Sequence, residues 1–242
     1  MKNLVVLSGL IAAASTGCII SSSSSNNAHV GATWQIKSVV SNQVTGCPSG
    51  FDTAALYNQP IDSANNPVGS PIIDLFDCVA GAGTSAALPP TAYMTWVEIT
   101  THSNSSVYAK SVPAILDVTD VDLTYNTDIY DDGGYFQFAW NLVGATSGQP
   151  LDCASAGVTG ASSGVEINAT LSGSTAATND QFNCSDHEDI TAGIPAGTYT
   201  VSIDAFTSAG AVGTAPTLTN KVINPQNEVT NLGTVNIPIT GH

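Results

Sequence analysis

Six aspartates near the middle of the chain form its largest group of side chains that can bind a cation. They are Asp117, Asp120, Asp122, Asp128, Asp131 and Asp132. Carboxylates grouped on turns can bind calcium, a hard cation that takes about six to eight oxygen ligands. The alternative is a charged linker that self-repulsion keeps extended. Calcium is the one cofactor that the sequence brings into consideration.

A second acidic segment, Asp186-His187-Glu188-Asp189, begins two residues after Cys184. We interpret it either as a solvated loop tip or as a weak cation or ligand contact that includes His187. The four histidines of the chain are scattered, and none has the spacing of a zinc ligand pair, which disfavours a zinc site.

One segment, Gly160-Ala161-Ser162-Ser163-Gly164, matches the G-x-S-x-G pattern of a hydrolase nucleophile elbow. That elbow presents its serine on a turn from a strand to a helix. No helical periodicity follows here, and matches arise easily in a chain rich in glycine and serine. We therefore expect a loop, no catalytic residues and no enzymatic activity.

An internal repeat organises the whole chain. A shift of 106 residues superimposes scarce residue types, and the matched pairs are Trp34/Trp140, Cys47/Cys153, Asp74/Asp180, Phe76/Phe182, Cys78/Cys184, Pro89/Pro195 and Tyr93/Tyr199. Because the chain has only three tryptophans and five cysteines, this agreement indicates a tandem duplication. We predict two domains, over residues 29–124 and 125–242.

Four of the cysteines belong to the repeat. In each copy the second cysteine follows the first by 31 residues, so the simplest pairing is Cys47 with Cys78 and Cys153 with Cys184. The fifth, Cys18, has no counterpart in the repeat.

Each copy shows the two-residue apolar period of half-buried strands. Apolar side chains alternate with polar ones along 30–36, 136–142 and 199–205. Turn-rich segments separate the strands, and no stretch has a convincing helical period. The prediction is an all-β protein of two tandem antiparallel β-sandwiches.

Two large side chains point away from the predicted first core. Tyr93, Val97 and their neighbours of the same parity face inward, which places Met94 and Trp96 on the outer side. Exposing the large apolar surface of an outward tryptophan to water is unfavourable unless another group covers it. We expect either an interface or a ligand contact such as sugar stacking.

The first 17 residues read as a secretory signal peptide, with Lys2 followed by an apolar run that is too short to span a membrane. Ser15-Thr16-Gly17-Cys18 resembles a bacterial lipobox, which predicts acylation of Cys18 and anchoring to a membrane; ordinary cleavage near Ala14 is the alternative. Residues 18–28 form a Ser/Asn-rich linker. We expect an exported protein, anchored in the outer membrane and facing the periplasm or the cell surface.

The charge excludes one class of partner. Lysine and arginine together number 4 against 19 acidic residues, for a net charge of −15. Nucleic acids are bound chiefly through basic side chains, so we expect no nucleic-acid partner.

The second copy carries a more specific resemblance. Its segment 194–201 (Ile-Pro-Ala-Gly-Thr-Tyr-Thr-Val), with the strand Asp180–Cys184 before it and 231–235 (Asn-Leu-Gly-Thr-Val) after it, resembles carboxypeptidase-regulatory-like domains, which are prealbumin-like, Ig-like sandwiches. The first copy departs from it at Pro90-Thr91 and at 120–123. The resemblance implies a non-catalytic adhesion, stalk or accessory module with a protein or glycan ligand. The alternative is a carbohydrate-binding module that uses Trp96.

Overall fold

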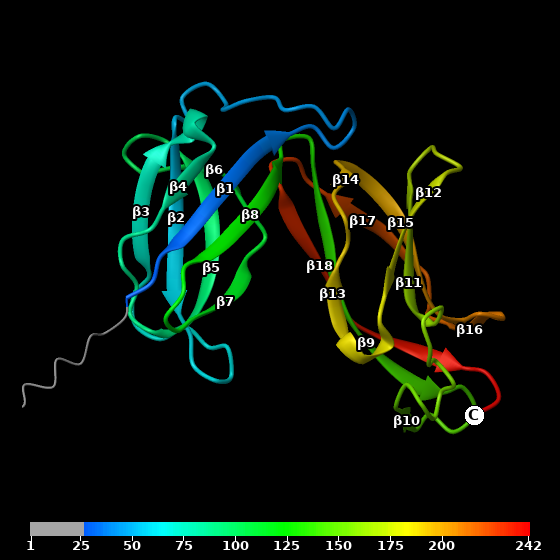
Figure 1. Cartoon of the computed structure of the whole chain (residues 1–242). Helices are drawn as coiled ribbons and strands as arrows, with labels where there is room; N and C mark the ends of the chain where they lie inside the picture. Colours follow the sequence, from blue (N-terminus) through cyan, green and yellow to red (C-terminus); the bar gives the residue numbers. More distant parts are fainter. Residues whose placement is uncertain (1–26) are drawn as a thin grey trace, which may run out of the picture.

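The computed structural model describes residues 27–242, which form an all-β structure with two short 3-10 helices, η1 (Cys78–Ala80) and η2 (Cys184–Asp186) (Figure 1). The predicted signal peptide, the lipidation site Cys18 and most of the predicted linker lie outside the described residues. The linker's last residue, Ala28, is buried in the first core. No helix in the described range is long and apolar enough to cross a membrane.

The first sandwich packs two sheets around one apolar core. One sheet has the order β4 (Ala82–Thr84), β1 (Val30–Lys37) and β8 (Leu123–Tyr130). The other has the order β3 (Ile72–Asp77), β2 (Thr53–Pro60), β5 (Thr91–Thr100) and β6 (Val107–Lys110), and β7 (Ala114–Val118) also pairs with β5. The core between these sheets includes Trp34, Leu56, Tyr93, Val97 and Ile129.

The second sandwich repeats this plan. On one side, β9 (Gly133–Gly144) pairs with β18 (Glu228–Ile239) along one edge and with β10 (Pro150–Leu151), β13 (Glu188–Ile190) and β14 (Ile194–Pro195) along the other. Facing it are β12 (Ala177–Phe182), β11 (Gly164–Leu171), β15 (Gly197–Thr207), β16 (Gly210–Thr214) and β17 (Leu218–Ile223). A single bridge between Gly213 and Ile239 joins the two sides.

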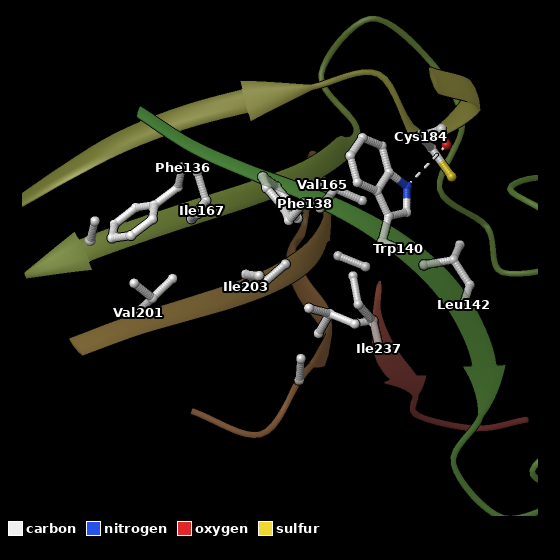
Figure 2. Close-up of a cluster of buried hydrophobic side chains, with 14 of the residues drawn as sticks. Phe136, Phe138, Trp140, Leu142, Val165, Ile167, Cys184, Val201, Ile203 and Ile237 are labelled. Carbon is white, nitrogen blue, oxygen red and sulfur yellow. Dashed lines mark hydrogen bonds between the residues drawn. The ribbon is translucent and has the colours of Figure 1, made fainter. Parts of the chain in front are cut away.

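The alternating apolar pattern predicts the buried faces correctly. In β9 the side chains of Phe136, Phe138, Trp140 and Leu142 are all buried and point into the second core (Figure 2). The prediction of an all-β sandwich is thereby confirmed, since burial follows strand parity as expected.

The first and last strands of each sandwich pair in parallel, which the sequence analysis did not predict. β1 pairs with β8 from Val30–Leu123 to Lys37–Tyr130, and β9 pairs with β18 in the same sense. A two-residue apolar period reports which face is buried but not the direction of the neighbouring strand. Since β8 runs to Tyr130, residues 125–130 lie in the sheet of the first sandwich, and only Asp131 and Asp132 separate β8 from β9.

The repeated residues make the same contacts in both copies. The Trp34 Nε1 donates to the carbonyl of Cys78 at 2.9 Å, and Trp140 Nε1 donates to that of Cys184 at 3.2 Å (Figure 2). In the same way the hydroxyls of Tyr93 and Tyr199 each donate to the carbonyl of the proline four residues earlier. These matched bonds identify the repeat as a structural scaffold.

Candidate functional site

Both predicted disulfides are present. Cys47 bonds to Cys78 and Cys153 bonds to Cys184, each pair 31 residues apart in the sequence. Disulfides persist mainly in oxidising compartments, so this pair of bonds is typical of an exported protein.

The six predicted calcium ligands do not converge. Asp128 forms an ion pair with Lys37 at 2.7 Å, and Asp122 accepts a hydrogen bond from the backbone N–H of His29. Asp117 and Asp120 are exposed on or near β7. Within residues 27–242 no group of three or more histidine, cysteine or acidic side chains is placed to hold a metal ion. The structure therefore provides no calcium site from these aspartates.

The Asp132 carboxylate makes hydrogen bonds within the protein. It accepts hydrogen bonds at 2.6 Å from both the Ser38 hydroxyl and the Val39 backbone N–H. Burial alone would raise the pKa of Asp132, but these hydrogen bonds outweigh it and lower the pKa. Asp132 thus fastens the loop after β1 to the connection between the sandwiches.

His187 occupies a turn that the first copy builds with glycine. Its φ of 60° is left-handed, as is the 66° of Gly81 at the equivalent position. Its carbonyl accepts the backbone N–H of Trp140, just as the Gly81 carbonyl accepts that of Trp34. The backbone of His187 is therefore part of the scaffold, while its side chain is exposed.

Ser162 lies in an exposed turn that leads into strand β11, not into a helix. The turn lines a small polar hollow of about 280 Å³ together with Asp186 and Asp189. Two motifs from distant parts of the sequence thus meet here, but the strand-to-helix geometry of a nucleophile elbow is missing around this serine.

The outward residues of the first sandwich form an apolar surface. Met94 and Trp96 lie on the outer side of β5, as the parity predicted, while Tyr93 and Val97 are buried in the core. Trp96 pairs across the strands with Tyr57, and Tyr57 pairs with Ile73. We call this surface the apolar face and define it as Tyr57, Ile73, Leu75, Met94 and Trp96.

The indole of Trp96 is enclosed by its neighbours. The Tyr57 ring stacks on it at a centroid distance of 4.8 Å and an angle of 6°, and the Lys110 ammonium lies 4.1 Å from its centroid. Because β2 and β6 flank β5 on opposite sides, these groups approach the indole from opposite sides. The Trp96 N–H donates to Glu98. A sugar that stacks on Trp96 would first have to displace Lys110.

The second sandwich has a polar surface at the same place. β11 pairs with β12 and β15 as β2 pairs with β3 and β5. Where the first copy has Tyr57, Ile73 and Trp96 in one row, the second has Asn168, Asn179 and Ser202. Hydrogen bonds link the amides of this polar row, including one of 2.9 Å from Asn179 to Asn168. The sandwich therefore does not require an apolar face.

A cleft of about 870 Å³ lies between the two sandwiches. Met94, Lys110 and Ile115 line it from the first sandwich, and Gln137 and Glu188 from the second. Since Met94 belongs to the apolar face and Lys110 covers Trp96, the cleft and the apolar face are continuous.

The joint beside this cleft depends on a residue that sequence reasoning missed. Asn227 is 2% exposed; its Oδ1 accepts the Tyr130 N–H at 2.7 Å and its Nδ2 donates to the Lys110 carbonyl at 2.8 Å. The backbone N–H of Asn227 donates to the Gly133 carbonyl. Tyr135 packs nearby against Tyr130, and burial raises its pKa. These contacts hold the two sandwiches together.

No protein-family model and no curated protein matches the chain. Similar solved structures include a leucine-rich repeat protein from Bacteroides thetaiotaomicron, at TM-score 0.38 and 13% identity over 89% of this chain and 26% of that one. The minor pilin of Streptococcus agalactiae matches at TM-score 0.30 and 10% identity, over 89% and 98%. A proposed adhesin from Bacteroides ovatus matches at 0.30 and 8%, over 86% and 89%. At these scores the likeness carries no functional argument.

Proposed function

We propose that the protein is an exported, non-catalytic binding module of the cell envelope that recognises another molecule through the apolar face of its first sandwich. One observation carries this proposal: the outer row of Tyr57, Ile73 and Trp96 is apolar where the duplicated sandwich has Asn168, Asn179 and Ser202. Exposed apolar patches on soluble proteins typically mark interaction sites. Ile73 and Leu75 remain 43% and 53% exposed.

A carbohydrate-binding module is the less favoured alternative. Protein sites that bind sugars by stacking need an open aromatic ring face, and Tyr57 and Lys110 lie against the indole of Trp96. The similar pilin and proposed adhesin are too distant to add support.

The first test is binding by the full chain to arrays of extracellular proteins and glycans. A variant that grafts the second copy's residues onto the apolar face should lose the binding; its changes are Tyr57→Asn, Ile73→Asn, Leu75→Gln, Met94→Thr and Trp96→Ser. The matched control alters the polar face through Asn168→Ala and Ser202→Ala and should bind like the unaltered protein. Equal binding by the graft, or no binding to any array member, would overturn the proposal.

The location part of the proposal rests on Cys18 and the Ser/Asn-rich residues 18–28, which would tether the sandwiches to the outer membrane. Cell fractionation should find the full chain with membranes and a Cys18→Ser variant in the soluble exported fraction. Recovery of the unaltered chain from the cytoplasm would contradict export.

A further inference from the structure

We infer that the partner is an extended, basic segment of another protein, which lies on the apolar face and continues into the cleft. This inference rests on the proposed function and names the class of its partner. The inference follows from the apolar side chains along this surface, from the unpaired strand edge at its cleft end and from the sign of its charge.

Apolar side chains lead from β3 across the sheet to the cleft between the sandwiches. Met94 lies on the apolar face and pairs across the strands with Ile115, which is 53% exposed and lines the cleft. Val229 lines the far side of the same cleft. An elongated partner with apolar side chains can therefore bury them along the whole path.

Where this path reaches the cleft, it meets an edge of the sheet. Among the described residues, β6 and β7 each pair with β5 alone, so their outer edges have no strand beside them. An extended peptide can add a strand to such an edge, with main-chain hydrogen bonds for affinity and alternate side chains for specificity. The Lys110 carbonyl of β6 already accepts a hydrogen bond from the Asn227 side chain, so it is not open to such a peptide.

The charge around this path selects a basic partner. Glu98 lies beside Trp96, and Glu188, Asp189 and Glu228 line the cleft. Lys110 is the one cation among the residues that line the cleft, and it lies against the Trp96 ring. A second copy of this chain would bring its own net charge of −15 onto the same surface, and like-charge contact disfavours that pairing.

Isothermal titration of the full chain with three synthetic peptides tests the inference. The probe alternates valine and lysine; one control replaces lysine by glutamate and the other replaces valine by serine. We expect the valine–lysine peptide to bind about tenfold or more tightly than either control, and more weakly as salt rises. The five-residue graft described above should lose this binding while still unfolding in one cooperative transition, which shows that it remains folded.

Several outcomes would overturn the inference. If the glutamate peptide binds as tightly as the lysine peptide, the partner is not selected by its basic charge. If the graft binds the lysine peptide in full, the apolar face is not the binding site. If the unaltered chain forms a dimer and the graft variant does not, the apolar face binds a second copy of this chain. If the chain binds only glycans on the arrays and the graft variant loses that binding, the proposed function stands. The inference that the partner is a basic protein segment is then refuted.

Discussion

Replacing Asn227 by glycine should loosen the joint between the two sandwiches. The side chain bridges the Tyr130 N–H and the Lys110 carbonyl, both in the first sandwich, from a position in the second. Asn227 has a left-handed φ of 62°, which glycine adopts without strain. The glycine variant therefore removes the two side-chain bonds and leaves the backbone conformation accessible.

The expected loss follows from those two bonds. A typical hydrogen bond contributes about 1 kcal/mol net, and a buried group left without a partner costs about 1–3 kcal/mol. With Asn227 only 2% exposed, water reaches the abandoned groups poorly, so we expect a loss of about 2–4 kcal/mol. Asn227→Ala should lose about 1–2 kcal/mol more, because a Cβ is disfavoured at left-handed φ.

Guanidinium unfolding followed by tryptophan fluorescence measures the effect, with Trp34 and Trp96 reporting on the first sandwich and Trp140 on the second. The matched control is Asn220→Gly, since Asn220 is exposed and also left-handed at φ 56°; its stability should change by less than about 0.5 kcal/mol. Equal midpoints for Asn227→Gly and Asn220→Gly would refute the assignment of Asn227 to the joint.

Two further predictions concern stability. Replacing Cys153 and Cys184 by serine should cost about 4 kcal/mol, because the bond closes a 31-residue loop in the unfolded chain; the Cys47/Cys78 double variant should lose a similar amount, and an unchanged denaturation midpoint in either would contradict this. Burial raises the pKa of all seven tyrosines in the folded state, so their stabilisation is complete below the unfolded pKa of about 10 and is lost as pH rises above it. Tyrosinate absorbance should therefore appear at a higher pH in the folded chain than in the chain unfolded by guanidinium, and coincident titration curves would contradict the prediction; the residues are Tyr57, Tyr93, Tyr108, Tyr125, Tyr130, Tyr135 and Tyr199.

The scaffold was predictable because its contacts repeat in the sequence. Cys47 and Cys78 have the same spacing as Cys153 and Cys184, and the buried parity of β5 placed Trp96 on the outer side. The rest of the apolar face was not found. Tyr57 lies on β2, whose counterpart β11 follows a longer loop, so the common shift of 106 residues does not align the two strands.

The joint was not predictable for a different reason. Asn227 meets its partners across 97 and 117 residues of sequence, and a single polar residue in a turn has no pattern that reports such contacts. The aspartates show the converse case, since closeness in sequence did not bring them together in space. Asp128 is directed to Lys37 on the neighbouring strand by the parallel register of β1 and β8.

That parallel register also determines how the protein responds to force. The first sandwich is entered at the start of β1 and left at the end of β8, and these two strands lie side by side over eight paired positions. Tension between the ends of the chain therefore pulls the strands along their length in opposite directions. Their hydrogen bonds must break together by sliding, whereas an antiparallel hairpin loaded at its open end would peel apart one bond at a time. β9 and β18 repeat the arrangement, so each sandwich resists stretching through a sheared pair of strands.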